Sequence, residues 1–537
     1  MRPTVTTAGT DHVPDCPVLI VGAGPTGLVL ALWLARLGIR VRIIDKTGEP
    51  GTTSRAVGVA ARTLELYRQL DLAEALVEGG VKVPAVNLWT RGKRAARLSL
   101  LKLGTGFTPF PFFLVFPQDA HERLLIERLG SLGIQVERRT ELISFEQHAE
   151  GARATLRTAD GAENLCEVKY LAGCDGAHST VRESLGVGFP GGTYSELFYV
   201  ADVDAHGPAV NDEIHLELDD ADFLAVFPLK KKGHLRLIGS VRRPAAEQKK
   251  ELTFEDVGRR VIEHMQLTVG RVNWFSTYHV HHRVAARFRG GRAFLLGDAA
   301  HIHSPAGGQG MNTGIGDAVN LAWKLAAVLG GHAPDGMLDS YEAERIGFAR
   351  KLVATTDRVF TVVTKPGRAA GFVRTRVAPV IAPLLFRVTA VRRFMFRTVS
   401  QTAITYRGSA LSEGSLGRIQ GGDRLPWVEL SPNRDNFEPL ASIAWQVHVY
   451  GEPKPGVEEC CAALAMPLHT FAWTPMMDRA GLSRGAIYLV RPDGYIALAD
   501  DGARPERLVE YFAHRGMTVS APSGLPESPS HSQRQHR

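Results

Sequence analysis

The residues best placed to do chemistry lie in the stretch GRAFLLGDAAHIHSPAGGQGMNTGIG, between Gly291 and Gly316. Its apolar residues 293–296 predict a short buried strand. Gly297 and Asp298 then place a carboxylate at the carboxyl end of that strand, where open α/β sheets bind ligands. The loop 305–310 has little side-chain bulk, so its backbone can approach a large flat group. We expect Asn312 to cap the next helix, whose N-terminus would stabilise negative charge by roughly 0.3–2 kcal/mol.

A second motif follows a predicted buried strand at residues 17–21. GAGPTG supplies Gly22, Gly24 and Gly27 in GxGxxG spacing, a helical pattern follows, and a strand at 41–44 ends on Asp45. Strand, glycine turn, helix, strand and acid together form a dinucleotide-binding fingerprint. The first glycine makes the turn, the second admits a pyrophosphate and the third lets helix and strand pack, while Asp45 would bind a ribose hydroxyl. Both NAD and FAD fit this fingerprint.

A third motif, GCDGAHSTVR, follows another apolar strand at residues 168–172. Asp175 ends the strand, and Ser179 begins a helix that carries Arg182. In isolation this motif, like the glycine loop before Asn312, also fits an ordinary turn before a capped helix. Two carboxylates at strand ends, in a chain that also carries the dinucleotide fingerprint, favour a ligand site.

Segments between these motifs can add to the same site. Arg55 is a candidate for contact with a phosphate or a ring face, although an exposed loop arginine is the commoner case. We expect a helix at residues 62–76, and Gln118 opens another helix whose first turn can touch a phosphate. The aromatic residues 107–116 would line either a core or a pocket, of which the core is the commoner case.

These motifs need an α/β scaffold, and we predict a Rossmann-like domain with a second domain inserted into it. Residues 213–218 and 235–241 alternate in polarity, which is typical of a half-exposed antiparallel sheet. Residues 366–412 are helical, basic and apolar together, which predicts a packed connector, with a membrane-surface helix as the alternative. The expected divisions are a disordered leader at 1–15; a discontinuous Rossmann-like domain at 16–80, 106–188 and 285–365; an inserted antiparallel-sheet domain at 81–105 and 189–284; the helical connector at 366–412; a small α/β domain at 413–520; and a disordered tail at 521–537.

Length and composition narrow the class of protein further. The 537 residues have room for roughly three domains of about 150 residues each. A hydrophobic content of 44% excludes global disorder. The net charge of +7 is the balance of interspersed charges of both signs, which favours anionic small molecules over nucleic acid as partners.

The cysteines and histidines argue against disulfides and metals. Five cysteines without a CxxC pair, no signal-peptide pattern and no apolar run of about 20 residues predict a cytoplasmic protein without stable membrane insertion. Five histidines lack carboxylate or cysteine partners at ligand spacing, so we expect no metal site. They are His279, His281, His282, His301 and His303.

Read together and in this order, the three motifs resemble the class A FAD-dependent aromatic hydroxylases, the para-hydroxybenzoate hydroxylase and phenol hydroxylase family of flavin monooxygenases. The resemblance runs from Val18 to Glu344 and includes SYEAER at residues 340–345. It continues more weakly into the C-terminal domain. There GGDRLP and LVRPDGY are similar to the thioredoxin-like domain of the phenol-hydroxylase and polyketide-hydroxylase branches. The adjacent Cys460 and Cys461 cannot replace the CxxC redox pair of a thioredoxin without strain.

The resemblance implies that the Rossmann-like domain binds FAD. Asp298 would bind the ribityl chain, the amides after Gly308 would face the pyrimidine edge of the ring, and Asp175 would support both FAD and NAD(P)H. The implied cofactor-binding residues are Gly22, Gly24, Pro25, Thr26, Gly27, Asp45, Lys46, Arg55, Gln118, Asp175, Gly297, Asp298, Gly308, Gly310, Met311 and Asn312.

The resemblance also implies a reaction. NADPH, or NADH, would reduce the flavin, O₂ would form a C4a-hydroperoxide, and its terminal oxygen would hydroxylate a small aromatic substrate of phenolic or polyketide type. The backbone carbonyl of Pro305 would be the acceptor for that hydroperoxide. We expect Phe227 and Pro228, together with residues 109–113, to form the substrate wall.

Several alternatives stay open at this stage. A Baeyer–Villiger or epoxidising flavin monooxygenase can share the fold, because a fold does not determine a reaction. A non-catalytic flavin-binding module is the alternative of a different class. The protein would be a monomer or a homodimer.

Overall fold

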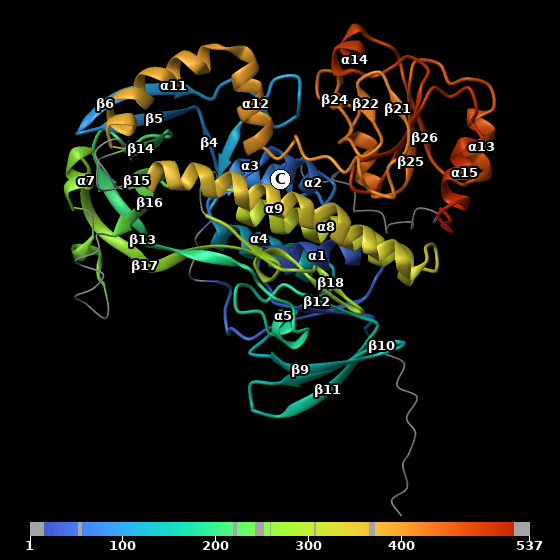
Figure 1. The fold of residues 1–537 in the computed structure, drawn as a ribbon, viewed down its shortest axis with the longest axis horizontal. Coiled ribbons are helices and arrows are strands. Elements are labelled where there is room, and N and C mark those ends of the chain that lie inside the picture. Colours follow the sequence, from blue (N-terminus) through green and yellow to red (C-terminus); the bar gives the residue numbers. More distant parts are fainter. Residues whose placement is uncertain are drawn as a thin grey trace, which may run out of the picture.

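The computed structural model describes residues 16–51, 56–218, 223–241, 252–257, 259–304, 308–364 and 371–519 (Figure 1). The expectations for the leader 1–15, for the tail 521–537, for Arg55 and for Pro305 therefore lie outside the described residues. No helix in the described ranges is both long and apolar enough to cross a membrane.

A six-stranded sheet forms the centre of the molecule, in the order β18-β19-β12-β1-β2-β8. Five strands run parallel, and only the edge strand β18 is antiparallel to its neighbour. The inner strands β1, β12 and β19 are buried along their whole length, as expected for parallel strands covered on both faces. The strands are β1 (Val18–Val21), β2 (Val41–Asp45), β8 (Val136–Arg138), β12 (Tyr170–Gly173), β18 (Arg289–Gly290) and β19 (Ala293–Leu295).

Helices pack on this sheet and contribute to the largest apolar core. The expected single helix at 62–76 is two helices, because Asp71 adopts a left-handed conformation with φ 58° between them. The helices of this part are α1 (Pro25–Arg36), α2 (Ala61–Arg68), α3 (Ala73–Gly79), α4 (Gln118–Ser131), α5 (Thr180–Ser184), α8 (Gly310–Leu329) and α9 (Asp339–Thr364).

An eight-stranded sheet forms a second body, in the order β20-β17-β13-β16-β15-β14-β5-β6. Its pairs are antiparallel except β14–β5. The short β20 follows the Gly297–Asp298 turn and pairs with the end of β17, so this sheet is hydrogen-bonded to the turn segment. Its strands are β5 (Ala85–Thr90), β6 (Lys93–Ser99), β13 (Gly191–His206), β14 (Ile214–Leu218), β15 (Phe223–Pro228), β16 (His234–Val241), β17 (Thr268–Val284) and β20 (His301–Ile302).

Two three-stranded sheets complete this half of the chain. One has the order β3-β7-β4 and lies between the two larger bodies, while the other is the antiparallel meander β11-β10-β9. Their strands are β3 (Gly58–Val59), β4 (Val81–Val83), β7 (Phe113–Val115), β9 (Glu141–His148), β10 (Gly151–Arg157) and β11 (Glu163–Val168); α7 (Arg259–His264) packs on the eight-stranded sheet.

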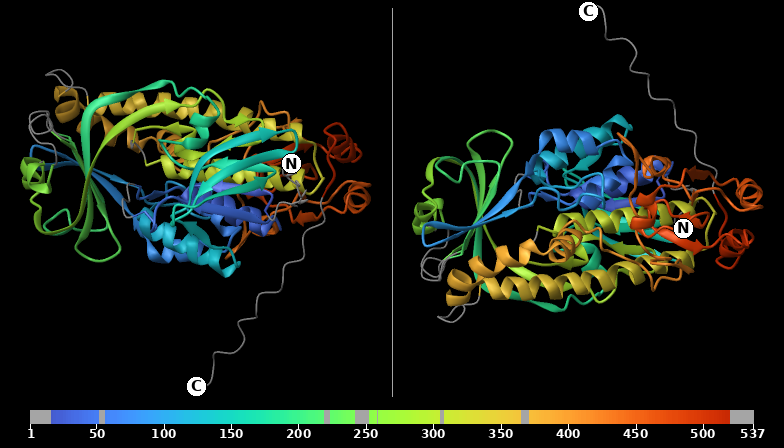
Figure 2. Two further views of the ribbon diagram at one scale, coloured as in Figure 1. Left: turned by 90° about the horizontal axis from the view of Figure 1, so that it is seen from below. Right: turned by 90° about the horizontal axis from the view of Figure 1, so that it is seen from above.

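Residues 371–399 form a helical connector, in agreement with the helical pattern of this segment. It comprises a π-helical turn at Val373–Val377, α11 (Ala378–Arg387) and α12 (Thr389–Val399). Figures 1 and 2 place α11 at the outer rim of the molecule, beside β6.

The C-terminal part folds around a mixed four-stranded sheet of order β26-β25-β27-β28, covered by three helices. β25 and β26 are parallel, and β27 is antiparallel to both β25 and β28. The elements are β25 (Gln446–Tyr450), α13 (Val457–Ala463), β26 (Leu468–Phe471), α14 (Pro475–Ala480), β27 (Ile487–Val490), β28 (Ile496–Asp500) and α15 (Arg507–Ala513), with two short hairpins, β21 (Ser415–Leu416) with β22 (Ile419–Gln420) and β23 (Glu429–Ser431) with β24 (Arg434–Asp435).

Candidate functional site

The sequence motifs lie at the carboxyl ends of four neighbouring strands of the six-stranded sheet. β1 runs into the glycine turn, β2 ends on Asp45, β12 is followed by Asp175, and β19 is followed by Asp298. Because these strands are parallel and adjacent in the order β19-β12-β1-β2, their carboxyl ends meet at the same edge. Such an edge is where open α/β sheets bind ligands.

The three glycines of GAGPTG have different surroundings. Gly22 adopts φ 103°, and a Cβ there would lie 2.3 Å from the Cys174 carbonyl oxygen. A Cβ on Gly27 would lie 2.0 Å from the Gly22 carbonyl oxygen. A Cβ on Gly24 would meet no protein atom within 4 Å. The protein's own packing thus requires the first and third glycines, whereas the second faces open space of the kind that a pyrophosphate needs.

The N-termini of α1 and α8 meet beside the Gly297 turn. Cβ atoms on Gly297 and Gly314 would lie 2.7 and 2.3 Å from the Thr26 hydroxyl, so the turn and both first helical turns are in close contact. Helix α8 begins at Gly310, so the expectation that Asn312 caps it is wrong, and Asn312 lies within the first turn. The amides of residues 310–312 have no intrahelical acceptor and can stabilise an anion.

The Asn312 side chain is held entirely by protein groups. Its oxygen accepts hydrogen bonds from the Ala60 amide and the Thr63 hydroxyl, both at 2.8 Å. Its nitrogen donates to the carbonyls of Gly58 and Gly308, both at 3.0 Å. Asn312 therefore ties the glycine loop before α8 to strand β3, and only its backbone amide is left for a ligand.

The three carboxylates at this edge differ in their burial and in the hydrogen bonds that they accept from protein groups. Asp45 accepts hydrogen bonds from the Ala23 amide at 2.7 Å and from the Thr47 amide at 2.8 Å. One oxygen of Asp175 accepts from the Val181 amide at 3.1 Å, and the other is buried without a partner among the described residues. Burial raises the pKa of Asp175 above its usual range. Asp298 is exposed in the 3₁₀ turn Gly297–Ala299.

A buried ion-pair cluster, which the sequence analysis missed, holds the Gly297 turn in place. Asp317 of α8 accepts hydrogen bonds from the Gly297 amide at 3.0 Å and from His301 at 2.7 Å. Its other oxygen pairs with Arg345 of α9 at 2.6 Å, and Arg345 also donates to the Thr313 carbonyl. Burial raises the pKa of Asp317, but the neighbouring Arg345 and His301 outweigh it, so the pKa lies below its usual range. The available signal was a charged residue on the apolar side of a predicted helix.

Arg182 joins the two carboxylate turns. The guanidinium donates to the Ala299 carbonyl at 3.1 Å, in the turn that contains Asp298, and to the Ala177 carbonyl at 2.9 Å, beside Asp175. It lies 4.1 Å from the centroid of the Phe189 ring. This arginine fixes the spacing between the GCDGAHSTVR motif and the Gly297–Asp298 turn.

The expected substrate-wall residues lie close to the glycine loop. A Cβ on Gly58 would lie 2.8 Å from the Phe113 ring and 3.7 Å from the Gly308 carbonyl oxygen. Phe113 and Phe227 pack against the same apolar cluster, and Pro228 is buried at the end of β15. An apolar surface therefore lies beside the backbone of Gly308, just before α8.

Two other expected cofactor contacts lie near the same edge. Lys46 is exposed directly after β2, next to Asp45. Gln118 begins α4, and its side-chain oxygen accepts a hydrogen bond from the Ala56 amide at 3.3 Å. The glutamine therefore contacts the residue that follows Arg55.

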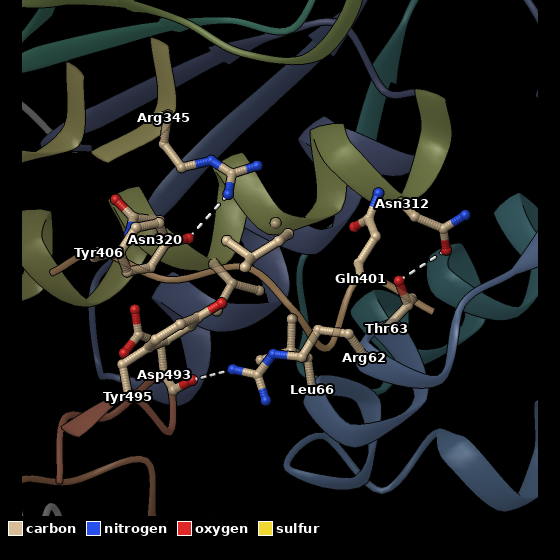
Figure 3. A pocket seen from close by; sticks show the side chains of 13 residues that line it. Arg62, Thr63, Leu66, Asn312, Asn320, Arg345, Gln401, Tyr406, Asp493 and Tyr495 are labelled. Carbon is tan, nitrogen blue, oxygen red and sulfur yellow. Dashed lines mark hydrogen bonds between the residues drawn. The ribbon is translucent and has the colours of Figure 1, made fainter. Parts of the chain in front are cut away.

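A cavity of about 20 Å³, room for a single water, lies behind the first turns of α8 (Figure 3). In Figure 3, Arg345 hydrogen-bonds Tyr406, Arg62 contacts the Asp493 backbone, and Thr63 bonds Asn312. The cavity is too small for an organic ligand. These contacts connect the C-terminal part to the helices that carry the site.

The geometry agrees with comparisons to known proteins. The model of a family described as "FAD binding domain" matches residues 15–356. A flavin-dependent monooxygenase of Mycobacteroides abscessus is 33% identical over 512 residues, which cover 92% of this chain and 99% of the relative. The chain belongs to the class A flavin monooxygenases. A 6-methylpretetramide 4-monooxygenase of Streptomyces rimosus is 37% identical to this flavin monooxygenase over 521 residues, 89% of this chain and 90% of the relative.

A solved structure supports the assignment over nearly the whole chain. The anhydrotetracycline hydroxylase OxyS from Streptomyces rimosus has a TM-score of 0.76 and 29% identity, covering 93% of this flavin monooxygenase and 99% of OxyS. The fold is therefore the mixed α/β fold of these enzymes, and the protein is an FAD-dependent monooxygenase, as the three motifs predict.

The residues at the edge fit a bound FAD. Gly24 has open space at its Cβ position, and one oxygen of Asp175 is buried without a partner among the described residues. The first-turn amides of α8 have no intrahelical acceptor and are suited to bind an anionic group. No group of three or more metal-ligating side chains is found in the described part of this flavin monooxygenase.

His303, beside the start of α8, gives the site a pH-dependent component. Its Nδ1 hydrogen-bonds the Ser304 carbonyl at 2.7 Å, and burial lowers its pKa to about 4. Because the unfolded pKa of about 6.5 is higher, the stabilisation from neutral His303 is complete above pH 6.5 and is lost as the pH falls through 4. Between pH 6.5 and 5 this residue alone should lower the free energy of unfolding by about 2 kcal/mol.

The check is urea unfolding of the native protein and a His303→Gln variant from pH 5 to 8. We expect the difference in unfolding free energy to shrink by about 2 kcal/mol as the pH falls, since glutamine does not titrate. A pH-independent difference for His303→Gln would contradict this account.

Proposed function

We propose that this FAD-dependent monooxygenase uses NADPH or NADH and O₂ to hydroxylate a polycyclic aromatic substrate of polyketide type. The observation that carries the proposal is the meeting of the glycine loop, the α8 N-terminus and the apolar cluster that contains Phe113 and Phe227. This arrangement lets a flat, electron-rich substrate lie against a flavin ring. The names of two relatives, 6-methylpretetramide 4-monooxygenase and anhydrotetracycline hydroxylase, support a substrate of this class.

The proposal gives each part of the edge a task. Bound FAD supplies the redox chemistry, accepting a hydride from the nicotinamide and activating O₂. Gly24 admits the pyrophosphate, and Asp45 binds a ribose hydroxyl. The amides of residues 310–312 hold negative charge at the flavin ring, in the way that oriented backbone dipoles stabilise developing anions.

The remaining assignments concern the reacting centre. Asp298 binds the ribityl chain, and Asp175 supports both FAD and the nicotinamide cofactor. Phe113, Phe227 and Pro228 exclude water from the oxygen-transfer step, which protects the activated oxygen from side reactions. The family resemblance implies that Arg55 contacts a phosphate of FAD. It also implies that the backbone carbonyl of Pro305 accepts a hydrogen bond at the reacting centre.

We also propose a division into domains. The six-stranded sheet with its helices is the FAD-binding domain, the eight-stranded sheet is the inserted substrate domain, residues 366–412 are the connector, and residues 413–520 are a thioredoxin-like domain. The element order β25-α13-β26-α14-β27-β28-α15 and the sheet order β26-β25-β27-β28 support the last assignment. Cys460 and Cys461 are consecutive in α13, so this domain does not carry out disulfide exchange. Its role is to pack against the helices that carry the site.

The test is NADPH oxidation by the purified, FAD-loaded protein in air, with and without a panel of phenols and polycyclic aromatic ketones. We expect several-fold stimulation by a polycyclic compound and a product that gains one oxygen atom. The product structure distinguishes a hydroxylated ring from an inserted ester oxygen, which would instead support Baeyer–Villiger chemistry. Tight FAD binding with unstimulated NADPH oxidation across the panel would contradict the proposed substrate class.

A further inference from the structure

The helical connector carries an apolar surface that no part of the described chain covers. Phe394 is 72% exposed and Leu384 is 54% exposed, although both belong to well-formed helices. We call this surface the outer apolar face. Its residues are Val380, Ile381, Leu384, Leu385, Val388 and Phe394.

The outer apolar face is a continuous stripe on α11. Val380 and Leu384 are spaced four residues apart, as are Ile381 and Leu385, so all four lie on one side of the helix, and Val388 follows at its C-terminal end. The other side packs inward, where Phe386 of α11 and Phe396 of α12 meet Leu103. A helix that is apolar on all sides is normally buried, and monomeric soluble proteins rarely expose a large apolar patch.

The charged side chains of this segment have one sign. The sequence contains no Asp or Glu between Asp357 and Glu413. Four exposed arginines border the exposed apolar residues of the two helices, and they are Arg376, Arg387, Arg393 and Arg397. The segment therefore combines exposed large apolar side chains with uniform positive charge.

We propose that the outer apolar face and its bordering arginines dock the protein peripherally on an anionic lipid surface. Apolar side chains that enter the acyl boundary and arginines that contact anionic headgroups are the two features of interfacial amphipathic helices. A second copy of this chain fits less well, because a symmetric contact through this face would oppose arginines to arginines without a nearby acidic residue of the segment. The location of α11 at the rim of the molecule leaves room for a flat surface (Figure 1; Figure 2).

The experiment is vesicle flotation of the full-length, FAD-loaded protein. Phosphatidylcholine vesicles, with and without phosphatidylglycerol, are used at low and high salt. We expect the protein to float only with the phosphatidylglycerol vesicles, and less at high salt, because salt screens the arginine contacts. Failure to float with phosphatidylglycerol vesicles at low salt would overturn the proposal.

Variants test which residues bind. Leu384→Asp with Phe394→Asp should reduce the bound fraction about tenfold, since it places two carboxylates in the interface. Arg387→Gln with Arg397→Gln should reduce binding and remove most of its salt dependence. FAD content and the thermal unfolding midpoint should stay at native values in both, which separates lost docking from lost folding.

Matched controls use exposed residues elsewhere. Leu165→Asp on β11 changes a leucine that is 68% exposed, and Arg479→Gln with Arg484→Gln removes two exposed arginines of the C-terminal part. These variants should bind vesicles as the native protein does. Equal loss of binding in the controls, or a concentration-dependent dimer that Leu384→Asp with Phe394→Asp abolishes in the absence of vesicle binding, would overturn the lipid assignment.

Discussion

A Glu344→Gln variant should lose about 3–5 kcal/mol of unfolding free energy, because it removes the carboxylate that two buried cations share. Glu344 of α9 accepts hydrogen bonds from Arg491 at both oxygens, at 2.7 and 3.0 Å. Lys324 of α8 donates to the same carboxylate at 2.9 Å. All three side chains are fully buried, so no water can replace the lost contacts.

The pKa shifts of Glu344 and Lys324 also show that the buried charges depend on one another. Burial raises the pKa of Glu344, but Arg491 and Lys324 outweigh it and hold the pKa well below its usual range. Burial lowers the pKa of Lys324 to about 8, and Glu344 opposes that shift. Asp493 pairs with Arg491 at 2.6 Å and completes a cluster of two cations and two anions. Removing one anion leaves a net buried charge.

Urea unfolding near neutral pH measures the loss, and limited proteolysis reports whether the C-terminal part still docks. Glu438→Gln is the matched control, since Glu438 forms an exposed pair with Arg434 at 3.4 Å and should contribute less than about 1 kcal/mol. Glu344→Gln combined with Arg491→Met should lose less than the sum of the single variants, because the cluster is then neutral again. Additive losses, or a Glu344→Gln cost below about 1 kcal/mol, would contradict this account.

A Gly24→Ala variant should bind FAD about 10- to 100-fold more weakly while the apo protein keeps its stability. An alanine Cβ at this position would meet no protein atom within 4 Å, and the backbone at φ −75° and ψ −179° suits alanine. The methyl group would occupy the space that the pyrophosphate needs. The apo protein should keep its stability within about 1 kcal/mol, because alanine restricts the unfolded chain but caps α1 less well than glycine does.

FAD titration by fluorescence quenching, with urea unfolding of the apo protein, separates the two effects. Gly27→Ala should lower both FAD affinity and apo stability, because its Cβ would lie 2.0 Å from the Gly22 carbonyl oxygen. Gly347→Ala, in open space within α9, is the control: it should leave FAD affinity unchanged and raise apo stability by about 1 kcal/mol, because alanine favours a helix interior. Native FAD affinity in Gly24→Ala would show that the cofactor lies elsewhere.

The features that sequence reasoning predicted are those encoded within short stretches. Strand, glycine turn, helix and acid occupy consecutive residues from Val18 to Asp45, so this motif predicts the α/β class correctly. Only the three motifs together indicate the flavin monooxygenase family, which the comparisons confirm. Asp175 and Asp298 each lie within three residues of the end of their strand, which is why both lie at one sheet edge. Local patterns of this kind do not depend on how distant segments pack.

The features that sequence reasoning missed depend on distant segments. Asp317 and Arg345 lie on different helices and act on Gly297 only after these helices pack together. Arg491 reaches Glu344 from the far end of the chain. The helix break at Asp71 and the start of α8 at Gly310 were missed because apolar spacing continues across the first, and because Asn312, which resembles a cap, instead bonds a neighbouring strand.

The pairing of β20 with β17 has a consequence for engineering this protein. Val284 pairs with His301 and Arg283 pairs with Ile302, so the edge of the eight-stranded sheet belongs to the same short segment as the Gly297 turn. His301 in turn hydrogen-bonds Asp317. A chimera that takes residues 191–284 from another monooxygenase therefore pairs a foreign β17 with the native β20, which follows the Gly297 turn. Because β14 also pairs with β5, exchanging the segment together with residues 85–99 and 301–302 keeps every strand pair of this sheet intact. The correct unit of recombination is therefore discontinuous in the gene.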